Sequence, residues 1–234
     1  MKRLLSTMHC DVRLQWRNGF YYAAAFVAVL FIIIVRQLPQ GDWRQIWPGM
    51  ILENLVISTY FFMSGLVLLE KGQGTLEAQV VTPLRPGEYL ASKAATLAGL
   101  ATVETLIMVL VTVGLHFNPL PLIVGILLMS GIYALGGFVA VSRYDAINEF
   151  LMPSMVWTLA FSLALIPYFG LWEHPLFYLH PLQAPLLLMK AAFSSVEAWQ
   201  VVYGLLYGGL WLGITFVLSR RAYHRFVIRK EGVR

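Results

Sequence analysis

The chain is poor in charge and in cysteine. Only 12% of its 234 residues are Asp, Glu, Lys or Arg, about half of the roughly 25% that is typical of a soluble domain. The single cysteine, Cys10, excludes an internal disulfide and a cysteine-based metal cluster. The sequence also lacks the Gly-x-x-x-x-Gly-Lys-[Ser/Thr] loop that cradles nucleotide phosphates. We therefore expect no cofactor on this chain, and any use of ATP and Mg requires a site on a partner chain.

What the chain has instead is hydrophobicity: 59% of its residues are hydrophobic, and its mean hydropathy is +0.70. The apolar residues come in blocks of about 20, the length that a helix needs to cross a bilayer. Lipid offers no hydrogen bonds to the backbone, so such blocks must be helical. The sequence predicts an all-α, polytopic membrane protein with six transmembrane helices. They are expected at Phe20–Leu38, Pro48–Leu69, Ala94–Leu115, Leu120–Val141, Phe150–Leu171 and Trp199–Leu218.

The distribution of basic residues predicts an orientation. Six spans place both termini on one side of the membrane, and of the 17 Lys and Arg residues only Arg36, Arg44 and Lys190 would lie on the other side. Cytoplasmic segments carry such an excess, so we expect both termini in the cytoplasm, an N-in/C-in topology. Insertion and contact with anionic lipid explain the basic excess, and no nucleic-acid partner is expected.

The segments outside the spans are short. Residues 1–19 are expected to form an amphipathic interfacial helix, although a frayed basic tail remains the alternative; residues 20–218 form the six-helix domain, and 219–234 a basic cytoplasmic tail. The outer segment 172–198 contains Leu186–Phe193, too short to cross and therefore expected to be re-entrant or interfacial. The apolar stripe of the N-terminal helix is formed by Leu4, Leu5, Met8, Val12 and Trp16.

Three polar residues inside the expected spans are candidates for a translocation path. Glu104 lies midway along the third span, where a carboxylate is costly and should face the bundle interior. It either lines a substrate or ion route or is a hydrogen-bonded packing residue. Glu53 and Asn54, near the outer end of the second span, belong either to the interface or to the mouth of a path. A proton-coupled transporter using Glu104 is one alternative function; an intramembrane enzyme is weakened because all five histidines fall outside the spans.

Two further patterns concern packing and metals. Small residues let membrane helices approach closely, which favours tight packing of the last span, with a dimer seam as the alternative. His174 and His180 flank a proline turn in the outer segment, but two histidines without a third ligand are a weak basis for a metal site, and none is expected. The small residues at four-residue spacing in the last span are Gly204, Gly208, Gly209 and Gly213.

Between the second and third spans lies a charged segment, Glu70–Lys93, with six charges in 24 residues. Gly72 and Gly74 should end the helix of the second span, and Pro86-Gly87 should start the chain back into the membrane. The segment is too polar to enter lipid, and its ordered glycine and proline breaks argue against a flexible linker. Such a unit suits a membrane subunit that a soluble partner pushes; a structured loop without a partner is the alternative.

Within this segment the residues predict a short helix. Thr75 can cap it, with Glu77 in its first turn where the helix dipole favours an acid. Pro83 should end it, and Leu76 and Val80, four residues apart, form a small apolar stripe. The residues expected to couple to a soluble partner are Glu70, Gly74, Thr75, Leu76, Glu77, Val80, Val81, Thr82 and Pro83.

Glu70, Gly74-Thr75-Leu76-Glu77, Thr82-Pro83-Leu84 and Lys93 resemble the first intracellular loop of ABC-2 type (type V fold) ABC transporter permeases. That loop runs Glu-x-x-x-Gly-Thr-Leu-Glu, then Thr-Pro-Leu, then a Lys at the next span. The rest of the chain agrees: an N-terminal helix carrying Asp11 and Arg17-Asn18, six spans, and a proline-containing outer segment. Within the family, the chain resembles permeases of the fluoroquinolone or drug export group.

The resemblance implies a permease subunit without ATPase activity. Its coupling helix, at about Thr75–Val81, would dock into cytosolic ABC ATPase subunits that hold ATP and Mg, and a second permease subunit would complete the path through the bilayer. The implied cargo is a drug or another amphipathic compound or lipid. The chain departs from better-known members in its short loop between the third and fourth spans and in lacking a large outer domain.

Overall fold

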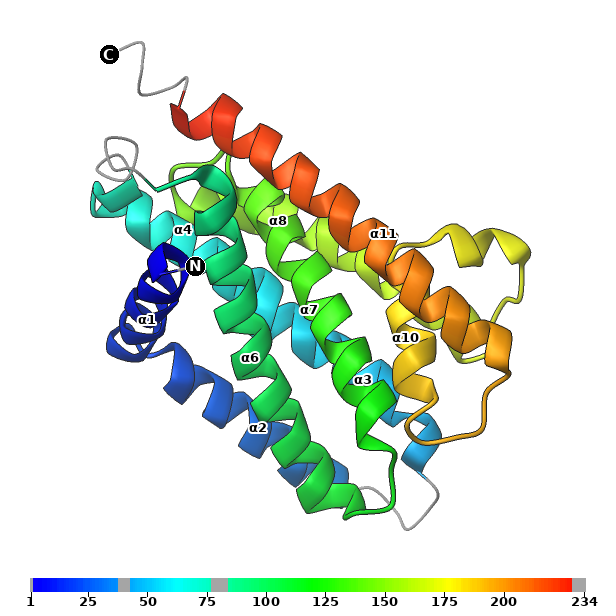
Figure 1. Ribbon diagram of the computed structural model, residues 1–234. Helices are drawn as coiled ribbons and strands as arrows, with labels where there is room; N and C mark the ends of the chain where they lie inside the picture. Colours follow the sequence, from blue (N-terminus) through cyan, green and yellow to red (C-terminus); the bar gives the residue numbers. More distant parts are fainter. Residues whose placement is uncertain (1, 38–42, 77–83, 229–234) are drawn as a thin grey trace.

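The computed structural model describes residues 2–37, 43–76 and 84–228, and every regular element in this part of the chain is a helix (Figure 1). Six segments are long and apolar enough to cross a membrane, as predicted. The chain is therefore a multi-pass membrane protein. The six segments are Phe20–Gln37, Trp47–Gly72, Pro86–Val113, Pro119–Val141, Ile147–Tyr168 and Ala198–Ile228.

The fourth span, α7 (Pro119–Val141), is the centre of the bundle (Figure 1). It packs against the second span, α6 (Pro86–Val113), α10 (Gln183–Lys190) and α11 (Ala198–Tyr223). In the most apolar window of this span 67% of the residues are buried, against 11% in α2 (Phe20–Gln37) and 11% in the last span. The outer helices therefore present apolar side chains to their surroundings, as lipid-facing or subunit-facing helices do.

The second span is not a uniform α-helix. It consists of α3 (Trp47–Leu55), the π-helical segment η2 (Val56–Phe61) and α4 (Phe62–Gly72). Short π-helical turns widen a helix locally and occur frequently at functional sites. Here η2 lies against α6 and α7, so the irregular turn faces the protein interior.

The third span starts about two turns earlier than predicted. The Glu88 carboxylate accepts a hydrogen bond from the Arg85 amide at 3.0 Å, and Pro86 occupies the first turn, an arrangement that starts helices efficiently. The start of α6 therefore lies in the charged segment, and Lys93 lies on a helix rather than in a loop.

The N-terminal helix α1 (Lys2–Arg17) lies within the predicted residues 1–19 and ends just before Gly19, which has a φ of +84°. Its polar residues Asp11 and Gln15 are buried, since α1 packs on α6. An apolar strip on the helix points away from the protein, which suits a helix that lies in a membrane interface. The exposed apolar residues of α1 are Leu5, Val12 and Trp16.

The segment between the fifth and sixth spans folds back on the bundle. After α8 (Ile147–Ser162) and α9 (Leu165–Tyr168) come the turn η3 (Pro175–Leu179) and α10. The residues of α10 from Gln183 to Met189 are buried between α7 and α11. The apolar stretch expected here to be re-entrant or interfacial thus forms a short helix inside the protein.

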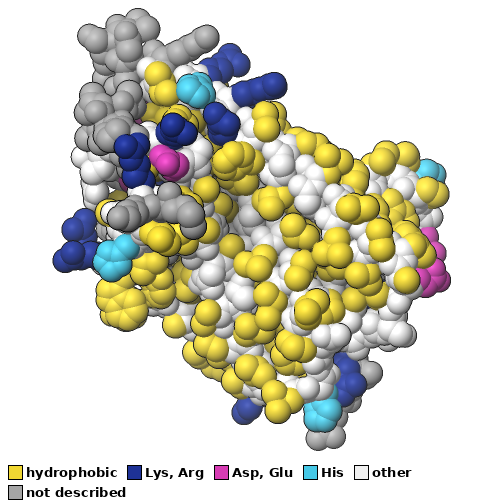
Figure 2. All heavy atoms as spheres, in the orientation of Figure 1, with side chains coloured by type: hydrophobic (Ala, Val, Ile, Leu, Met, Phe, Trp, Pro, Cys, Tyr) yellow, Lys and Arg dark blue, Asp and Glu magenta, His cyan; other side chains and the backbone are white. Residues whose placement is uncertain are grey.

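The start of α1 and the end of η4, the first and last described residues, lie at the same end of the bundle (Figure 1), as an even number of spans requires. Figure 2 shows most of the Lys and Arg side chains on this face gathered at that end, with an apolar surface over the spans. Residues 219–228, expected to belong to a tail, continue the last helix through η4 (His224–Ile228).

Candidate functional site

A buried lysine sits between two carboxylates at the base of the charged segment. The Lys93 ammonium lies 2.6 Å from Glu70 Oε1 and 2.9 Å from Asp11 Oδ1. The Lys93 side chain is 0% exposed, and both carboxylates are nearly as well buried. We call Asp11, Glu70 and Lys93 the ionic clamp. It joins α1, the end of α4 and the start of α6, which are far apart in the sequence.

Neutral hydrogen-bond donors complete the ionic clamp. The Tyr89 hydroxyl donates to Glu70 Oε2 at 2.7 Å, and the Ser92 hydroxyl donates to Asp11 Oδ2 at 2.5 Å. The Lys93 ammonium also lies 4.9 Å from the centre of the Tyr89 ring, in a cation–π contact. Every carboxylate oxygen of the ionic clamp thus has a donor, which is the condition for a buried ion pair to be tolerated.

The surroundings of the ionic clamp tie it to further helices. Gln15 of α1 donates to the Thr96 hydroxyl of α6 at 2.9 Å. The Tyr89 ring lies 5.4 Å from Tyr223 near the end of α11, and Tyr223 stacks on Phe138 of α7. The site therefore connects five helices, α1, α4, α6, α7 and α11, at one end of the bundle.

Lys71, the residue after Glu70, anchors the same point to another part of the protein. Its ammonium donates to the carbonyl oxygens of Ser142 and Tyr144 at 2.7 and 2.6 Å and lies 3.4 Å from Asp145. These residues connect α7 and α8. The last turn of the second span is thus held by α1 and α6 on one side and by the α7–α8 connection on the other.

Beyond this anchor, the chain turns sharply as predicted. α4 ends at Gly72, and Gly74 has a φ of +67°, which favours glycine. The Thr75 hydroxyl donates back to the Glu70 carbonyl oxygen at 3.1 Å, and Leu76 is 3% exposed. The remaining residues predicted to couple to a soluble partner, Glu77, Val80, Val81, Thr82 and Pro83, lie outside the described residues.

The sequence pointed to Glu70 and to Lys93 through the loop motif, and to Asp11 through the N-terminal helix, but not to their pairing. Tyr89, Ser92 and Lys71 were missed altogether. One signal in the sequence could have indicated the pairing. Lys93 lies directly before a long apolar run, and a charge in that position needs a partner of opposite charge. Its partners come from other helices, and sequence spacing does not show which helices meet.

The three path candidates fall into two separate groups. The Ser58 hydroxyl of η2 donates to Glu104 Oε2 at 2.6 Å, and Asn54, one turn earlier, is fully buried. Glu53 instead accepts a hydrogen bond from Ser162, at the end of α8, at 2.7 Å. Asn54 and Glu104 therefore belong to the bundle core, whereas Glu53 links α3 to α8.

The glycines of the last span divide into two pairs. A Cβ added at Gly204 would lie 2.5 Å from Leu188 Cγ, and one at Gly208 would lie 3.1 Å from Leu128 Cδ1. At Gly209 and Gly213 nothing lies within 4 Å. The first pair allows α11 to pack closely on α10 and α7, and the second pair leaves an open strip on the outer side.

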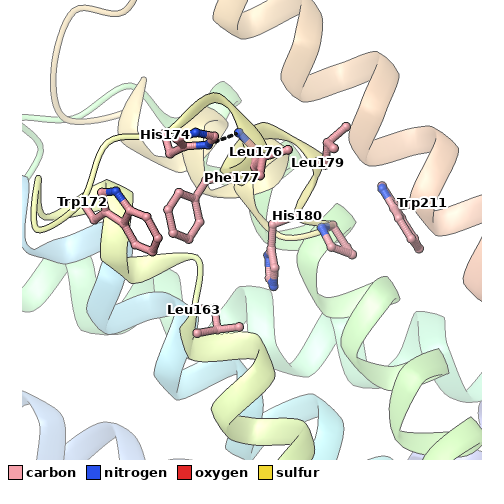
Figure 3. Close-up of a pocket in the computed structure, with 9 residues that line it drawn as sticks. Leu163, Trp172, His174, Leu176, Phe177, Leu179, His180 and Trp211 are labelled. Carbon is pink, nitrogen blue, oxygen red and sulfur yellow. Dashed lines mark hydrogen bonds between the residues drawn. The ribbon is translucent and has the colours of Figure 1, made fainter.

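An apolar cavity of about 520 Å³ lies at the other end of the bundle, between η3 and α11 (Figure 3). Its walls include Trp172, Phe177 and Trp211, together with the two outer-segment histidines, His174 and His180. Among the described residues, no group of three or more His, Cys, Asp and Glu side chains is placed to hold a metal. The histidines are instead part of an aromatic wall.

Both ring nitrogens of His180 are used in the fold. Nδ1 accepts from the Leu182 amide at 3.3 Å, and Nε2 lies 3.0 Å from the Ala160 carbonyl oxygen, to which the neutral ring donates. Burial lowers the pKa of His180, and the hydrogen bond to Ala160 opposes this effect only in part.

This lowered pKa predicts a pH dependence of stability. Around the ordinary histidine pKa of about 6.5, the unfolded chain binds more protons at this residue than the folded chain. The contribution of His180 to the stability of the folded protein is therefore complete above that pH, and it is lost as the pH falls through the folded-state pKa. The thermal unfolding midpoint of the purified protein should fall between pH 7.5 and pH 5 by more in the wild type than in His180→Gln. His116→Gln, at an exposed histidine, is the control and should lose as much stability as the wild type. An equal fall of the midpoint in the wild type and in His180→Gln contradicts this prediction.

The comparisons with known proteins agree with a transport function. A family model described as the fluoroquinolones export permease protein family matches residues 2–231. Two proteins named fluoroquinolones export permease protein, from Mycobacterium tuberculosis strains CDC 1551 / Oshkosh and ATCC 25618 / H37Rv, are each 31% identical over 237 residues, covering 100% of both chains. These matches confirm the resemblance to export permeases and indicate a transporter rather than an enzyme. The chain belongs to the fluoroquinolones export permease protein family.

Proposed function

We propose that this chain is the membrane-spanning subunit of an ATP-driven ABC exporter for drugs of the fluoroquinolone type or related amphipathic compounds. A second permease subunit completes the path, and separate cytosolic ATPase subunits hold the ATP and Mg. The assembly sits in a bacterial inner membrane with the ionic clamp on the cytoplasmic side. Family membership over the full chain supports the transport function, and the basic residues gathered near the termini support the orientation.

The observation that carries the ATP-driven mechanism is the anchoring of the charged segment. A soluble partner can do work on a membrane domain only through a connection that transmits displacement. Glu70 and Lys71 hold the start of this segment to α1, α6 and the α7–α8 connection through short, mostly buried contacts. A push on the segment therefore moves several helices together. In this mechanism nucleotide binding on the partner shifts the population between states with inward and outward access.

Export is tested in a bacterial strain lacking its own drug pumps. The chain is co-expressed with an ABC ATPase of its own organism that co-purifies with it, and cellular norfloxacin accumulation is measured by fluorescence. We expect lower accumulation with the active ATPase and no effect with a hydrolysis-deficient one. If export persists without ATPase activity, stops when an ionophore collapses the proton gradient at constant ATP, and is lost in Glu104→Gln, the proton-coupled alternative replaces this proposal.

The coupling role predicts the effect of one charge reversal. Glu77→Lys should abolish both export and co-purification of the ATPase, while leaving the amount of folded permease unchanged, because the residue is proposed to contact the partner. The control is Glu149→Lys, which reverses an exposed charge in the first turn of α8. Full export and normal ATPase co-purification by Glu77→Lys contradict the coupling role.

A further inference from the structure

A second cavity adjoins the apolar cavity at the end of the bundle opposite the ionic clamp. It has a volume of about 380 Å³ and shares His174 and Phe177 with the apolar cavity as lining residues. We call it the polar cavity. It is also lined by Tyr168, the last residue of the fifth span, and by Gln200, which lies in the first turn of the sixth. The polar cavity therefore lies where two spans end, at the level of the lipid headgroups.

Aromatic residues agree with this position. Tyr178, which lines the polar cavity, packs against Trp199 and Tyr203 with ring centres 5.7 and 5.6 Å away. Tyr and Trp gather at the boundary between membrane and water, because their rings are apolar and one edge is polar. The group thus marks the headgroup level at this end of the protein.

The apolar cavity lies deeper in the membrane. Trp211, one of its lining residues, lies more than three turns inside the sixth span. Leu163, another, lies more than one turn before the end of the fifth span. The two adjoining cavities thus change from polar to apolar in the direction from the headgroups to the hydrocarbon, as a phospholipid does.

The polar cavity carries one charge of each sign. Lys190 and Glu173 both line it, and among the described residues neither forms an ion pair. The Lys190 ammonium lies 5.8 Å from the centre of the Tyr168 ring, in a cation–π contact. Because the two charges do not neutralise each other directly, a ligand that carries both signs can pair with both.

His174 supplies a further donor to the polar cavity. Its Nδ1 accepts a hydrogen bond from the Leu176 amide at 3.2 Å, drawn as a dashed line in Figure 3. In the neutral ring the proton is therefore on Nε2, which can donate to a ligand. An ammonium and an imidazole N–H are both groups that bind phosphate oxygens, and Lys190 and His174 bring them to the same cavity.

We propose that the two cavities together bind a zwitterionic phospholipid of the phosphatidylethanolamine type. Lys190 and His174 bind its phosphate, Glu173 binds its ammonium, and one acyl chain lies in the apolar cavity between η3 and α11. Charge complementarity favours this occupant. An anionic lipid would place its negative charge near Glu173 without neutralising that carboxylate, and a small soluble zwitterion would not fill the apolar cavity.

Native mass spectrometry of the purified full chain in detergent measures the binding. Phosphatidylethanolamine should bind about tenfold more tightly than phosphatidylglycerol with the same chains, the value of one hydrogen bond to a charged group. Lys190→Met should weaken both lipids, because both carry a phosphate. Glu173→Gln should weaken phosphatidylethanolamine about tenfold and should not weaken phosphatidylglycerol, so that the preference disappears.

Two variants at exposed charges outside both cavities are the matched controls. Arg36→Met and Glu149→Gln should bind both lipids as the wild type does. The unfolding midpoint in detergent without phospholipid shows whether each variant is folded. Should Lys190→Met fail to fold, Glu173→Gln, at an exposed residue, decides the comparison.

Phosphoethanolamine, the headgroup without its chains, separates a lipid from a soluble zwitterion. It should not displace the lipid even at roughly a hundredfold excess, because burial of the acyl chain supplies much of the affinity. Displacement at that excess assigns the polar cavity to a soluble zwitterion and rejects the lipid. Equal affinities of the wild type for the two lipids, or an unchanged preference in Glu173→Gln, also reject the proposal. None of these measurements involves transport, so their outcome is independent of the proposed function.

Discussion

Lys93→Met is expected to lower the free energy of unfolding by about 3–5 kcal/mol, the range measured when one partner of a buried ion pair is removed. The substitution leaves Asp11 and Glu70 buried without their cation, and no water can replace the lysine, whose side chain is 0% exposed. For a chain of this length each kcal/mol shifts the thermal unfolding midpoint by about 2–4 °C, so the midpoint should fall by about 10 °C. Thermal unfolding in detergent measures it.

Two further variants show whether charge is the cause. Lys190→Met makes the same change at a partly exposed lysine at the opposite end of the bundle and should have little effect. Combining Lys93→Met with Asp11→Asn and Glu70→Gln removes all three charges, and the triple variant should recover most of the lost stability, because buried ion groups can be replaced at little cost when no charge stays unpaired. A triple variant as unstable as the single one would show that packing, not charge, dominates.

Gly137→Ala is expected to destabilise the bundle by about 1–3 kcal/mol, the usual cost of overpacking a core, or more. Gly137 of α7 faces the π-helical turn of the second span, and an added Cβ would lie 2.6 Å from the Tyr60 carbonyl oxygen and 3.3 Å from Ser64 Oγ. A backbone oxygen cannot rotate away as a side chain does, so two central spans must separate. The result is a lower thermal unfolding midpoint and reduced norfloxacin export.

The preceding residue supplies the control. At Gly136 an added Cβ would meet only Phe161 Cζ, at the ordinary distance of 3.8 Å, and alanine has a higher helix propensity than glycine. Gly136→Ala should therefore be neutral or slightly stabilising. Equal unfolding midpoints for the two variants would mean that α7 and the second span adjust to the extra methyl group, contrary to this prediction.

The spans were predictable because each depends on a local property. A block of apolar residues is driven into lipid whatever its neighbours are, so the six blocks marked the six helices correctly, with errors only at their ends. The end of the second span near Gly72 was equally local, because Gly74, two residues further on, has a positive φ that a helix does not accommodate. The early start of α6 was missed because its first turns are polar and are defined by capping rather than by hydrophobicity.

The candidate site was predictable only in part. The loop motif singled out Glu70 and Lys93, but their contact and the role of Asp11 depend on how α1, α4 and α6 pack. The four glycines of the last span share one spacing pattern, yet only Gly204 and Gly208 are packed closely. Glu53 and Asn54 are adjacent in sequence, but Glu53 is hydrogen-bonded to Ser162 of α8, whereas Asn54 is buried in the bundle core.

The sequence alone determined that this protein crosses the membrane with six helices, interrupts them at a charged segment, and resembles export permeases, because hydrophobicity, glycine breaks and motifs belong to individual segments. Only the tertiary structure decided which charges neutralise each other, which glycines let helices touch, and that Trp172 and Trp211 face one cavity. Those features depend on pairs of residues brought together from distant segments. A buried charge or donor requires a partner, but only the packing of the helices determines which residue that partner is.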